Sequence, residues 1–437
     1  MNGRTVSARK AAAESLKAFS KHGKYTNLEV ASSLSRYSFS EEDKRLYTAL
    51  VYGVAERIPT LDHVISGLSS RPLCDVDIDA LTSLRLGLYQ LIYMDRIPDH
   101  AALSETVALV PQRSRGFVNA VLREFLRRGK EIPLPPEEDT GAYFSVKYSC
   151  PAELCRFLIS SLGRERAEGV LSASVSKRDV TLRVNTLVCS ADELIRDVFP
   201  NGKINPLADD MIDVPTVGGA DMTDARWFVQ DAASRLAVSA LSPVPGETVI
   251  DTCAAPGGKS FSAAIDMKNE GSVISFDLHA NKTDLIKKGA ERLGITIIEA
   301  SANDASYPLE KYRGMADRVL CDAPCSGLGV MSKKPDIKYK DVSDIARLPE
   351  IQYRILCGAS EYVRQRGALV YSTCTVNPDE NEGVVKRFLE EYGDFSLTPF
   401  SAGGLSSDGM LTLLPQEHNT DGFFIAKMTR SADDKRT

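Results

Sequence analysis

DTCAAPGGK, residues 251–259, is the stretch of sequence that decides the fold. It continues the apolar run Glu247–Thr252 (ETVIDT), and its two consecutive glycines permit a tight turn from a strand into a helix. Small residues at such a turn let a ligand come close to the backbone. The sequence therefore predicts a strand–turn–helix unit with a ligand site at the turn.

Strand-like runs alternate with helical stretches on both sides of this turn, from Val229 to the end of the chain. The further runs are Ser272–Asp277 (SVISFD), Ile295–Ala300, Arg318–Cys321 and Ala368–Tyr371. Regular alternation of this kind is typical of a parallel sheet covered by helices on both faces. We therefore expect an α/β Rossmann-like domain over residues 229–437.

The front of the chain has a different pattern. Residues 1–130 read as an all-helical domain because apolar residues recur with helical spacing, at Leu46, Leu50, Val51, Val54 and again at Leu84, Leu88, Leu91 and Ile92. Ser40 with Asp43 is a plausible helix cap.

The proline-rich stretch 131–138 (EIPLPPEE) predicts a linker. Residues 141–228 mix helices with β-rich runs such as Val180–Val184, which favours a small α+β module.

Composition excludes several classes of protein. The 437 residues are 43% hydrophobic and 26% charged, and neither a signal peptide nor a membrane-spanning run is visible, so we expect a cytoplasmic protein without membrane contact. The nine cysteines lack framework spacing and should be reduced thiols. No C-x-x-C pair occurs and the five histidines lie far from the cysteines, so we expect no metal site. We also expect a monomer.

Charge is distributed unevenly along the chain. The net charge is −6, but residues 1–130 hold 19 Lys/Arg against 14 Asp/Glu, which gives +5. Basic residues crowd one predicted helix near the end of this domain, at Arg113, Arg115, Arg123, Arg127 and Arg128. Contact with nucleic-acid phosphates is the functional interpretation, and a solvated helix face is the alternative.

Acidic residues follow the predicted strands where a cofactor would sit. Asp277 ends the second strand and can accept hydrogen bonds from both hydroxyls of a ribose. Asp304 follows the third strand and suits an adenine amino group, with a loop or cap carboxylate as the alternative. The turn lacks the G-x-G-x-x-G pattern of NAD sites. S-adenosylmethionine, an adenosine cofactor without phosphates, fits better.

Two cysteines follow the fourth and fifth strands, Cys325 in DAPC (322–325) and Cys374 in STC (372–374). Ligands bind at these strand ends, so the two thiols should converge. Beside a methyl donor, a thiolate that adds to carbon 6 of cytosine makes carbon 5 nucleophilic. Asp322 is the candidate contact to ring nitrogen N3, in protonated or proton-sharing form, and Lys259 could orient it or be a surface lysine. The alternative is that both cysteines are buried structural thiols, and the residues alone do not say which one attacks.

Four motifs together resemble the RNA cytosine-5 methyltransferases. They are DxCAAPGGK, DAPCSGxG, YSTCT and DGFFIAK (Asp421–Lys427). The front half is similar to the bacterial subgroup of ribosomal RNA small subunit methyltransferases B, whose helical domain resembles the antitermination factor NusB. That likeness rests on Leu50–Val54, Leu84–Pro98 and Gly116–Arg123.

The resemblance implies a specific set of functional residues. Cys374 would be the nucleophile, Cys325 would serve product release, and Asp322 and Lys259 would assist. Lys333 and Lys334 would border the RNA. Cofactor contacts would fall at Cys253, Ala254, Ala255, Pro256, Gly257, Gly258, Lys259, Asp277, Asp304 and Asp322.

Three alternatives stay open at this point. The substrate expected from the resemblance is 16S ribosomal RNA, and transfer RNA is the first alternative. Methylation of an amine is the second, although such enzymes typically carry an Asn/Asp-Pro-Pro-aromatic strand end, whereas this chain has DAPC. A non-catalytic RNA-binding antitermination factor is the third, although Cys374 and the Gly257–Gly258 turn are both intact.

Overall fold

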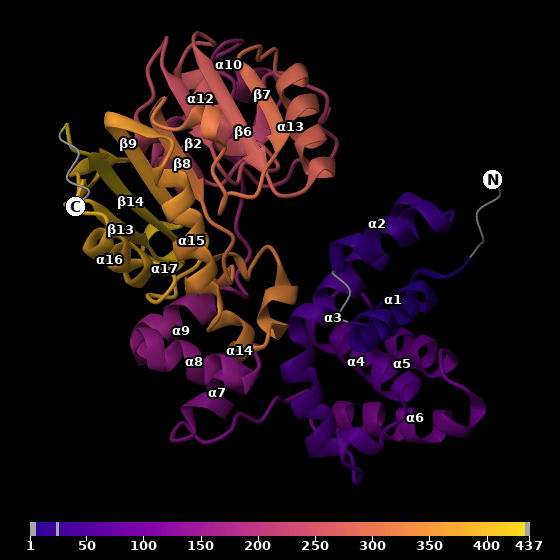
Figure 1. The fold of residues 1–437 in the computed structure, drawn as a ribbon. Helices are drawn as coiled ribbons and strands as arrows, with labels where there is room; N and C mark the ends of the chain where they lie inside the picture. The colour runs from indigo at the N-terminus through magenta and orange to yellow at the C-terminus, as the bar shows by residue number, and fades with distance from the viewer. Residues whose placement is uncertain (1–5, 23–25, 433–437) are drawn as a thin grey trace. The chain divides into compact units, whose positions relative to one another are not determined.

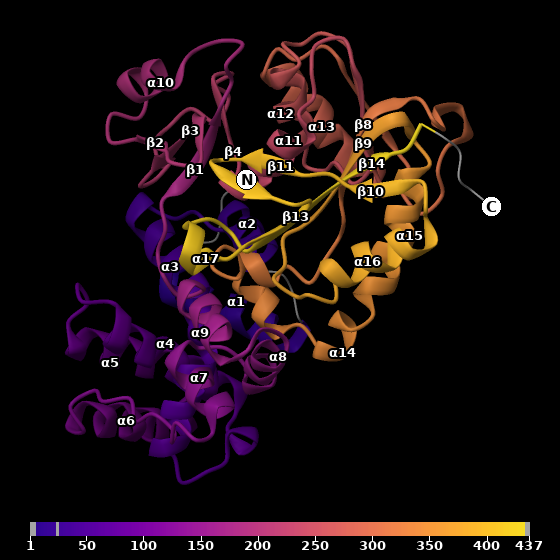
Figure 2. The same cartoon turned by 90° about the vertical axis from the view of Figure 1, so that its left-hand side faces the viewer.

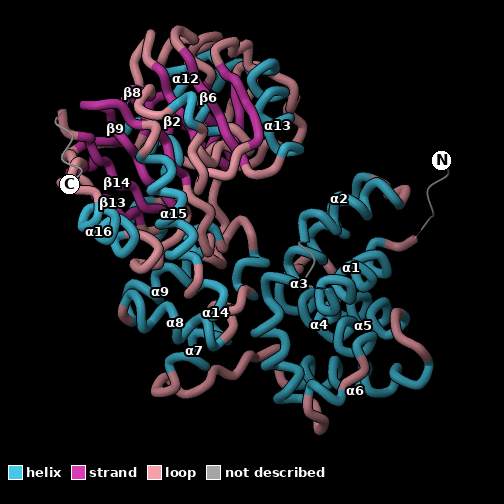
Figure 3. Tube along the Cα trace, in the orientation of Figure 1, coloured by secondary structure: helices cyan, strands magenta, loops and turns pink. Residues whose placement is uncertain are grey.

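The computed structural model describes residues 6–22 and 26–432, which form two compact units (Figure 1). The helical unit takes in the described residues up to Val175 together with Met331–Lys340, and the sheet unit takes in Ser176–Val330 and the described residues from Asp341 onward. Figure 3 shows helices and loops in the helical unit and long strands in the sheet unit. The chain therefore passes from the sheet unit into the helical unit and back at residues 331–340.

The helical unit is built from nine α-helices among its described residues. They are α1 (Ala8–His22), α2 (Thr26–Arg36), α3 (Glu41–Leu68), α4 (Ile78–Tyr93), α5 (Asp99–Ala108), α6 (Gln112–Arg127), α7 (Thr140–Lys147), α8 (Ala152–Leu162) and α9 (Arg164–Ala173), with a short 3₁₀ turn η1 (Leu73–Asp75). The predicted apolar positions Leu50, Val54, Leu84 and Leu88 are fully buried. Ser40 caps α3 by accepting a hydrogen bond from the Asp43 amide at 3.1 Å, which confirms the predicted cap.

The predicted middle module, residues 141–228, is divided between the two units. Its helices α7, α8 and α9 belong to the helical unit, and its strands belong to the sheet unit. The helices lie in the helical unit because α7 and the residues after it contact α3. The Thr60 hydroxyl of α3 donates to the Val146 carbonyl at 2.7 Å, and the Thr60 amide donates to Ser149 Oγ at 3.3 Å. Both side chains are buried, so these bonds fix α7 against α3.

Met331–Lys340, the inserted segment, is anchored inside the helical unit by its last turn, η4 (Pro335–Tyr339). Lys338 is fully buried and donates to the Ser149 carbonyl at 3.3 Å, and the Tyr339 hydroxyl donates to the Ala55 carbonyl at 2.7 Å. The Tyr339 ring meets Phe19 edge to face at 5.6 Å between centroids. No pattern in the sequence predicted that this segment packs in the helical unit.

A small antiparallel sheet opens the sheet unit. Its strand order is β2 (Lys203–Asn205), β3 (Ala208–Val214), β1 (Val180–Val184) and β4 (Trp227–Val229), and α10 (Ala191–Asp197) packs on it. Arg183 in β1 is buried and contacts Asp210 at 2.7 Å and Asp266 at 3.1 Å. Asp266 lies in α12 (Gly258–Asp266), so this buried pair ties the small sheet to the helix that follows the glycine turn.

The main sheet has the order β10-β14-β9-β8-β5-β6-β7. Strands β5 (Thr248–Asp251), β6 (Ser272–Asp277), β7 (Ile298–Ala302), β8 (Ala316–Asp322) and β9 (Val363–Thr373) run parallel. The last strand, β14 (Phe423–Arg430), is antiparallel to β9 and pairs with β10 (Phe395–Leu397) and β13 (Met410–Leu413). The predicted parallel core is thus extended by antiparallel strands at one edge.

Helices cover both faces of this sheet (Figure 2). Val249, Leu320 and Val370 pack with α11 (Ala232–Leu241), α12 and α13 (Ala280–Arg292), and their neighbours Ile250, Cys321 and Tyr371 pack with α15 (Leu348–Ser360) and α16 (Glu382–Glu391). Successive residues of each strand therefore enter opposite cores. Short elements complete the unit: α14 (Val342–Ile345), α17 (Pro415–His418), η2 (Glu310–Tyr312), η3 (Leu328–Val330) and the β11–β12 hairpin (Phe400–Ala402, Leu405–Ser407).

Within the described residues, every helix is too short or too polar to cross a membrane.

Candidate active site

The glycine turn connects β5 to α12 as the sequence predicts. Gly257 has φ +115° and precedes the first residue of α12, a backbone conformation that side-chain-bearing residues rarely adopt. A Cβ atom there would also lie 2.4 Å from the Phe261 ring. The turn is fixed further by the Ala254 amide, which donates to the Phe276 carbonyl at 2.7 Å. The backbone of the turn therefore lies at the carboxyl end of the sheet, next to the end of β6.

Two of the expected cofactor residues, Asp277 and Asp304, follow neighbouring strands. Asp277 ends β6 and is 8% exposed, and the exposed apolar side chain of Leu278 follows it. The Asn303 amide donates to the Asp277 carbonyl at 3.0 Å, which brings the loop of Asp304 to this position. Asp304 itself is exposed and accepts the Ser306 amide at 2.9 Å. A carboxylate beside an exposed apolar surface suits a ribose and an adenine ring.

The two cysteines after β8 and β9 converge. Cys325 Sγ and Cys374 Sγ lie 3.3 Å apart, and both side chains are half-buried. The convergence follows from the register, in which Asp322 lies opposite Ser372 in adjacent parallel strands. The hydrogen bond to Cys374, followed by burial, raises the pKa of Cys325 well above its ordinary value. This hydrogen bond and burial therefore favour the protonated form of Cys325.

Lys259 and Asp322 form an ion pair beside the thiols. Lys259 Nζ donates to Asp322 Oδ2 at 2.7 Å, and the Ser372 hydroxyl donates to Asp322 Oδ1 at 2.7 Å. Burial lowers the pKa of Lys259, but the charge of Asp322 and its hydrogen bond outweigh burial, so that the pKa is raised. Lys259 is thus not a surface lysine, and it remains an ammonium that orients Asp322.

The charge of Cys374 also contributes to the raised pKa of Lys259, which means that the two groups interact electrostatically. Because this interaction is mutual, the Lys259 ammonium favours the thiolate form of Cys374. The ring of Phe423, from the late DGFFIAK motif, lies 5.2 Å from Lys259 Nζ and holds the cation in place. The site therefore contains a protected cation next to a thiol.

Asp251, at the end of β5, is a buried acid behind this pair. Burial raises its pKa from 3.8 to about 7, against the hydrogen bond that it accepts from Ser260 at 2.7 Å. Its Oδ1 atom has no hydrogen-bond partner in the part of the chain that the structure describes. Such a group is stable as the neutral acid and becomes costly when ionised.

No pattern in the sequence indicated the residues that fix the two thiol loops to each other. Glu380 is fully buried, and it accepts the Ser326 amide at 2.8 Å and Gln352 Nε2 at 2.8 Å. Gln352 Nε2 also donates to the Pro324 carbonyl at 3.0 Å, and the hydroxyls of Ser326 and Thr375 lie 2.6 Å apart. These bonds, here called the Glu380 clamp, join the residues on either side of Cys325 to the residue after Cys374.

A second contact between the loops uses glycine backbone. The Gly329 amide donates to the Cys374 carbonyl at 3.1 Å, and the Gly422 amide donates to the Gly329 carbonyl at 2.9 Å. A Cβ atom on Gly329 would lie 1.8 Å from the Gly422 carbonyl oxygen, so only glycine fits. Asp421, which precedes Gly422, is paired with Arg178 at 2.9 Å. The DGFFIAK motif therefore supports the loop of the nucleophile candidate.

The expected RNA-binding residues lie in the helical unit. Arg113, Arg115, Arg123 and Arg127 on α6 and Arg128, which caps its C-terminus, are all exposed. Arg127 and Arg128 both pair with Glu124, and Arg123 donates to Asn119 at 3.1 Å, so much of this charge is engaged along the helix. Lys333 and Lys334 are exposed on the inserted segment. In the described residues, no group of three or more His, Cys, Asp or Glu side chains has metal-site geometry.

Two protein families match separate parts of the chain. Residues 238–429 match the family described as 16S rRNA methyltransferase RsmB/F, and residues 6–127 match the NusB family. A probable ribosomal RNA small subunit methyltransferase B from Bacillus subtilis is 37% identical over 97% of this chain and 99% of its own length. The chain belongs to the RsmB/F family.

A second relative and two solved structures are also similar to this chain. A probable ribosomal RNA small subunit methyltransferase B from Synechocystis is 33% identical over 98% of this chain and 100% of its own length. The solved structure of PH0851 has a TM-score of 0.77 at 23% identity, over 98% of this chain and 99% of that one, which supports the fold. A methyltransferase homolog from Pyrococcus horikoshii has a TM-score of 0.56 at 27% identity, over 68% of this chain and 100% of its own. The chain is an RNA methyltransferase that uses S-adenosylmethionine.

Proposed function

We propose that this protein methylates carbon 5 of a cytosine in 16S ribosomal RNA, with Cys374 as the attacking nucleophile. One observation carries the proposal: two thiols, 3.3 Å apart, lie beside a buried lysine–aspartate pair at the carboxyl end of a methyltransferase sheet. Carbon 5 of cytosine is not nucleophilic until a group adds to carbon 6, so a thiol at this position has a defined use.

In the first step, Cys374 acts as a thiolate and forms a bond from its sulfur to carbon 6. The nearby Lys259 ammonium supports the thiolate, and the raised pKa of Cys325 keeps the second thiol protonated. Negative charge develops toward N3 of the ring during this addition. The Lys259–Asp322 pair supplies the hydrogen bond and the proton there, with Asp322 in the proton-sharing form expected from sequence.

S-adenosylmethionine supplies the methyl group, and the glycine turn, Asp277 and Asp304 are the residues proposed to hold it. After transfer, carbon 5 loses its proton to a water molecule, the double bond between carbons 5 and 6 re-forms, and the carbon–sulfur electrons return to Cys374. N3 returns its proton to the Lys259–Asp322 pair. Cys325 assists this departure because its thiol is within hydrogen-bond distance of the leaving sulfur. Loss of Cys325 should therefore slow release rather than attack.

Support for small-subunit ribosomal RNA as the substrate comes from the family and from the named relatives, which match over nearly the whole chain. The helical unit, with its exposed arginines on α6 and lysines on the inserted segment, is the part proposed to bind this RNA. We propose that the enzyme acts as a cytoplasmic monomer without a metal ion.

The test is incubation of the full-length protein with labelled S-adenosylmethionine and unmethylated 16S rRNA, followed by mapping of 5-methylcytosine. Cys374→Ala should abolish methyl transfer, and Cys325→Ala should accumulate a covalent protein–RNA adduct. Cys74→Ala removes an exposed thiol of the helical unit and serves as the matched control, with unchanged transfer expected.

Three results would contradict parts of this proposal. An adduct that persists only in the Cys374 variant would exchange the roles of the two thiols. Label on transfer RNA but not on 16S rRNA would change the substrate, and label on an exocyclic nitrogen would change the chemistry. RNA binding without any methyl transfer would favour a non-catalytic factor.

A further inference from the structure

The two thiols of the site are chemically alike, and the contacts between them act on both. A hydrogen bond of 3.3 Å joins Cys325 Sγ and Cys374 Sγ, and both side chains are half-buried. Repulsion between two thiolates would also be mutual. These interactions make the pair ionise one thiol at a time, but they do not select which thiol ionises first. The selection depends on charged groups that act on one sulfur more than on the other.

Glu380 is a fully buried carboxylate that is joined to this pair by hydrogen bonds. Its Oε2 atom accepts the Ser326 amide and Gln352 Nε2, each at 2.8 Å. Its Oε1 atom accepts Asn377 Nδ2 at 3.1 Å and the Thr375 hydroxyl at 3.5 Å. All four partners are neutral donors, so they stabilise the negative charge but do not cancel it. Within residues 6–22 and 26–432, Glu380 has no ion pair.

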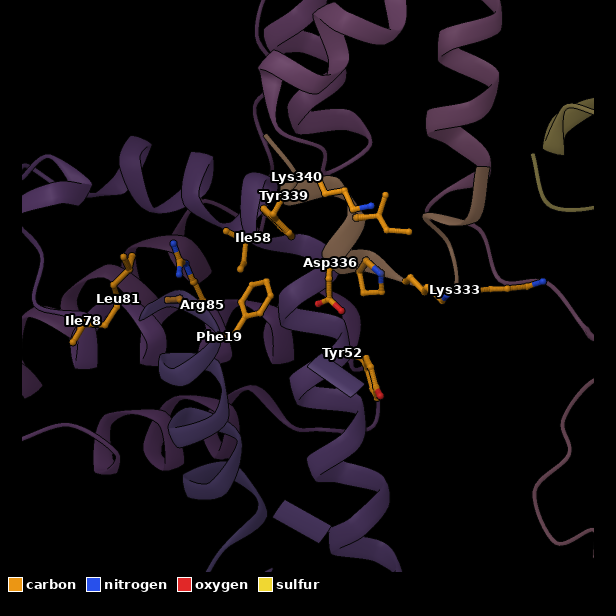
Figure 4. A pocket seen from close by; sticks show the side chains of 14 residues that line it. Phe19, Tyr52, Ile58, Ile78, Leu81, Arg85, Lys333, Asp336, Tyr339 and Lys340 are labelled. Atoms are coloured by element: carbon orange, nitrogen blue, oxygen red, sulfur yellow. The ribbon is translucent and has the colours of Figure 1, made fainter. Parts of the chain in front are cut away.

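The lysines of the inserted segment lie in the helical unit. Lys338 is fully buried there, and Lys333 and Lys340 line a pocket of the same unit (Figure 4). None of them pairs with Glu380 in the part of the chain that the structure describes. The negative charge of Glu380 is therefore not offset by the cations that follow the Cys325 loop in the chain.

The charges that act on the two thiols differ in sign. Cys374 interacts electrostatically with the Lys259 ammonium. The hydrogen bond to Cys374, burial and the charge of Cys374 raise the pKa of Cys325 most. The carboxylates of Glu380 and then of Asp322 raise this pKa further. Asp322 is already paired with Lys259 at 2.7 Å, so Glu380 is, among the described residues, the carboxylate without a cation beside it.

Tyr371 also interacts with Cys325, but it carries no charge. Burial raises the pKa of Tyr371 well above its ordinary value. Its hydroxyl donates to the Glu380 carbonyl at 2.7 Å. The tyrosine therefore fixes the backbone of Glu380 and adds no charge beside Cys325.

We propose that the negative charge of Glu380 assigns the roles of the two thiols: it keeps the proton on Cys325 and leaves nucleophilic attack to Cys374. The bond to the Ser326 amide places this charge next to the peptide bond that follows Cys325. A nearby negative charge disfavours a thiolate. Glu380 is fully buried and acts through Cys325, so it is a positioning residue. The inference rests on the proposed function, since it takes Cys374 to be the attacking thiol.

Two pairs of side chains separate this charge from the hydrogen bonds of Glu380. Glu380→Gln keeps the size of the side chain and an acceptor oxygen, but it removes the charge. Glu380→Asp and Glu380→Asn form a second pair, one methylene shorter, that again differs in charge at equal size. Each substitution is made in Cys374→Ser protein, in which Cys325 is the remaining thiol of the site, and folding is checked by circular dichroism.

Alkylation by iodoacetamide measures the thiolate of Cys325 without RNA. Mass spectrometry follows the peptide that contains Cys325 over a series of pH values, and the exposed thiol of Cys74 is the internal reference. The neutral member of each pair should be alkylated about fivefold faster or more near neutral pH, with its titration midpoint at a lower pH. Asp379→Asn removes an exposed carboxylate next to Glu380 in the chain, where solvent screens the charge, and should leave the rate unchanged.

Two alkylation results would overturn the inference. The first is an equal rate for the charged and the neutral member of both pairs. The second is faster alkylation in Glu380→Asp and Glu380→Asn alike, with Glu380→Gln unchanged, which would show a loosened loop and no effect of the charge.

Covalent trapping on RNA tests the roles of the thiols directly. A 16S rRNA transcript that contains 5-fluorocytidine should stay attached to the enzyme after methyl transfer, because carbon 5 then has no proton to lose. With both cysteines present the adduct should form at Cys374, and Glu380→Gln should move part of it to Cys325. An adduct at Cys374 alone in Glu380→Gln protein would overturn the inference. An adduct at Cys325 in the wild-type protein would instead overturn the proposed function.

Discussion

Cys325 Sγ and Cys374 Sγ lie 3.3 Å apart, although 49 residues separate them in the chain. The contact exists because β8 and β9 are adjacent parallel strands and both thiols follow the carboxyl ends of these strands. Two thiols this close together are also susceptible to oxidation to a disulfide.

Hydrogen peroxide should inactivate the enzyme reversibly. One thiol is oxidised to a sulfenic acid, and attack by the other releases water and forms a Cys325–Cys374 disulfide. We expect loss of more than about nine-tenths of methyl transfer and recovery with dithiothreitol. Mass spectrometry of the non-reduced digest checks the pairing, and Cys325→Ser should form no such bond. A disulfide between other cysteines, with the same loss of activity, would contradict this prediction.

Replacement of Lys259 by Met should reduce methyl transfer about 10²- to 10³-fold. The substitution removes the cation that holds Asp322 and favours the Cys374 thiolate, while it keeps most of the side-chain volume. Single-turnover rates measure the effect. Lys259→Arg, which keeps the charge, should lose less activity than the Met variant, and equal losses would argue against an electrostatic role.

Asp251 should make the protein less stable above neutral pH. Its pKa is about 7 in the folded protein and 3.8 without the fold, so the folded state binds the extra proton between these values. The stability from this group is present at low pH and is lost as the pH rises through about 7, with an upper bound of about 4 kcal/mol. Denaturant unfolding at pH 5.5 and 8 should show a larger loss for wild type than for Asp251→Asn. Equal losses of stability in the two proteins would contradict a raised pKa for Asp251.

The Glu380 clamp should control product release. Glu380→Ala leaves the buried Ser326 amide without its acceptor and removes one of the two acceptors of Gln352 Nε2, so the Cys325 loop loosens. We expect accumulation of the covalent RNA adduct, as in Cys325→Ala, together with slower peroxide-induced disulfide formation. Glu380→Gln keeps an acceptor oxygen and should restore part of both readouts. If Glu380→Ala protein is less stable but forms the disulfide at the normal rate when folded, Glu380 has a structural role and does not control product release.

Gly329→Ala should disturb the support of Cys374. The added Cβ atom would meet the Gly422 carbonyl at 1.8 Å, and this neighbour is backbone, which cannot rotate away. A destabilisation of about 1–3 kcal/mol is expected, with loss of methyl transfer. Thermal unfolding and activity are the measurements. Gly67→Ala, at a position with nothing within 4 Å, is the matched control and should be neutral or stabilising.

Much of the fold could be predicted from local pattern. The pattern of apolar residues located β1 and β6, and the glycine turn identified the unit that begins the parallel sheet. The same pattern placed Asp322, Cys325 and Cys374 at strand ends, because those ends mark the ligand edge of such a sheet. The family resemblance then separated the roles of the two thiols, which periodicity could not do.

The sequence by itself determined the parallel strands, the turn at Gly257 and the reactive side chains at the strand ends, since each strand and turn depends on residues close together in the chain. Only the tertiary structure decided that α7, α8 and α9 join the helical unit, that Lys338 anchors the inserted segment there, and that Glu380 binds the Cys325 loop. These features depend on buried hydrogen bonds between residues 28 to 189 positions apart, and such bonds leave no period in the sequence.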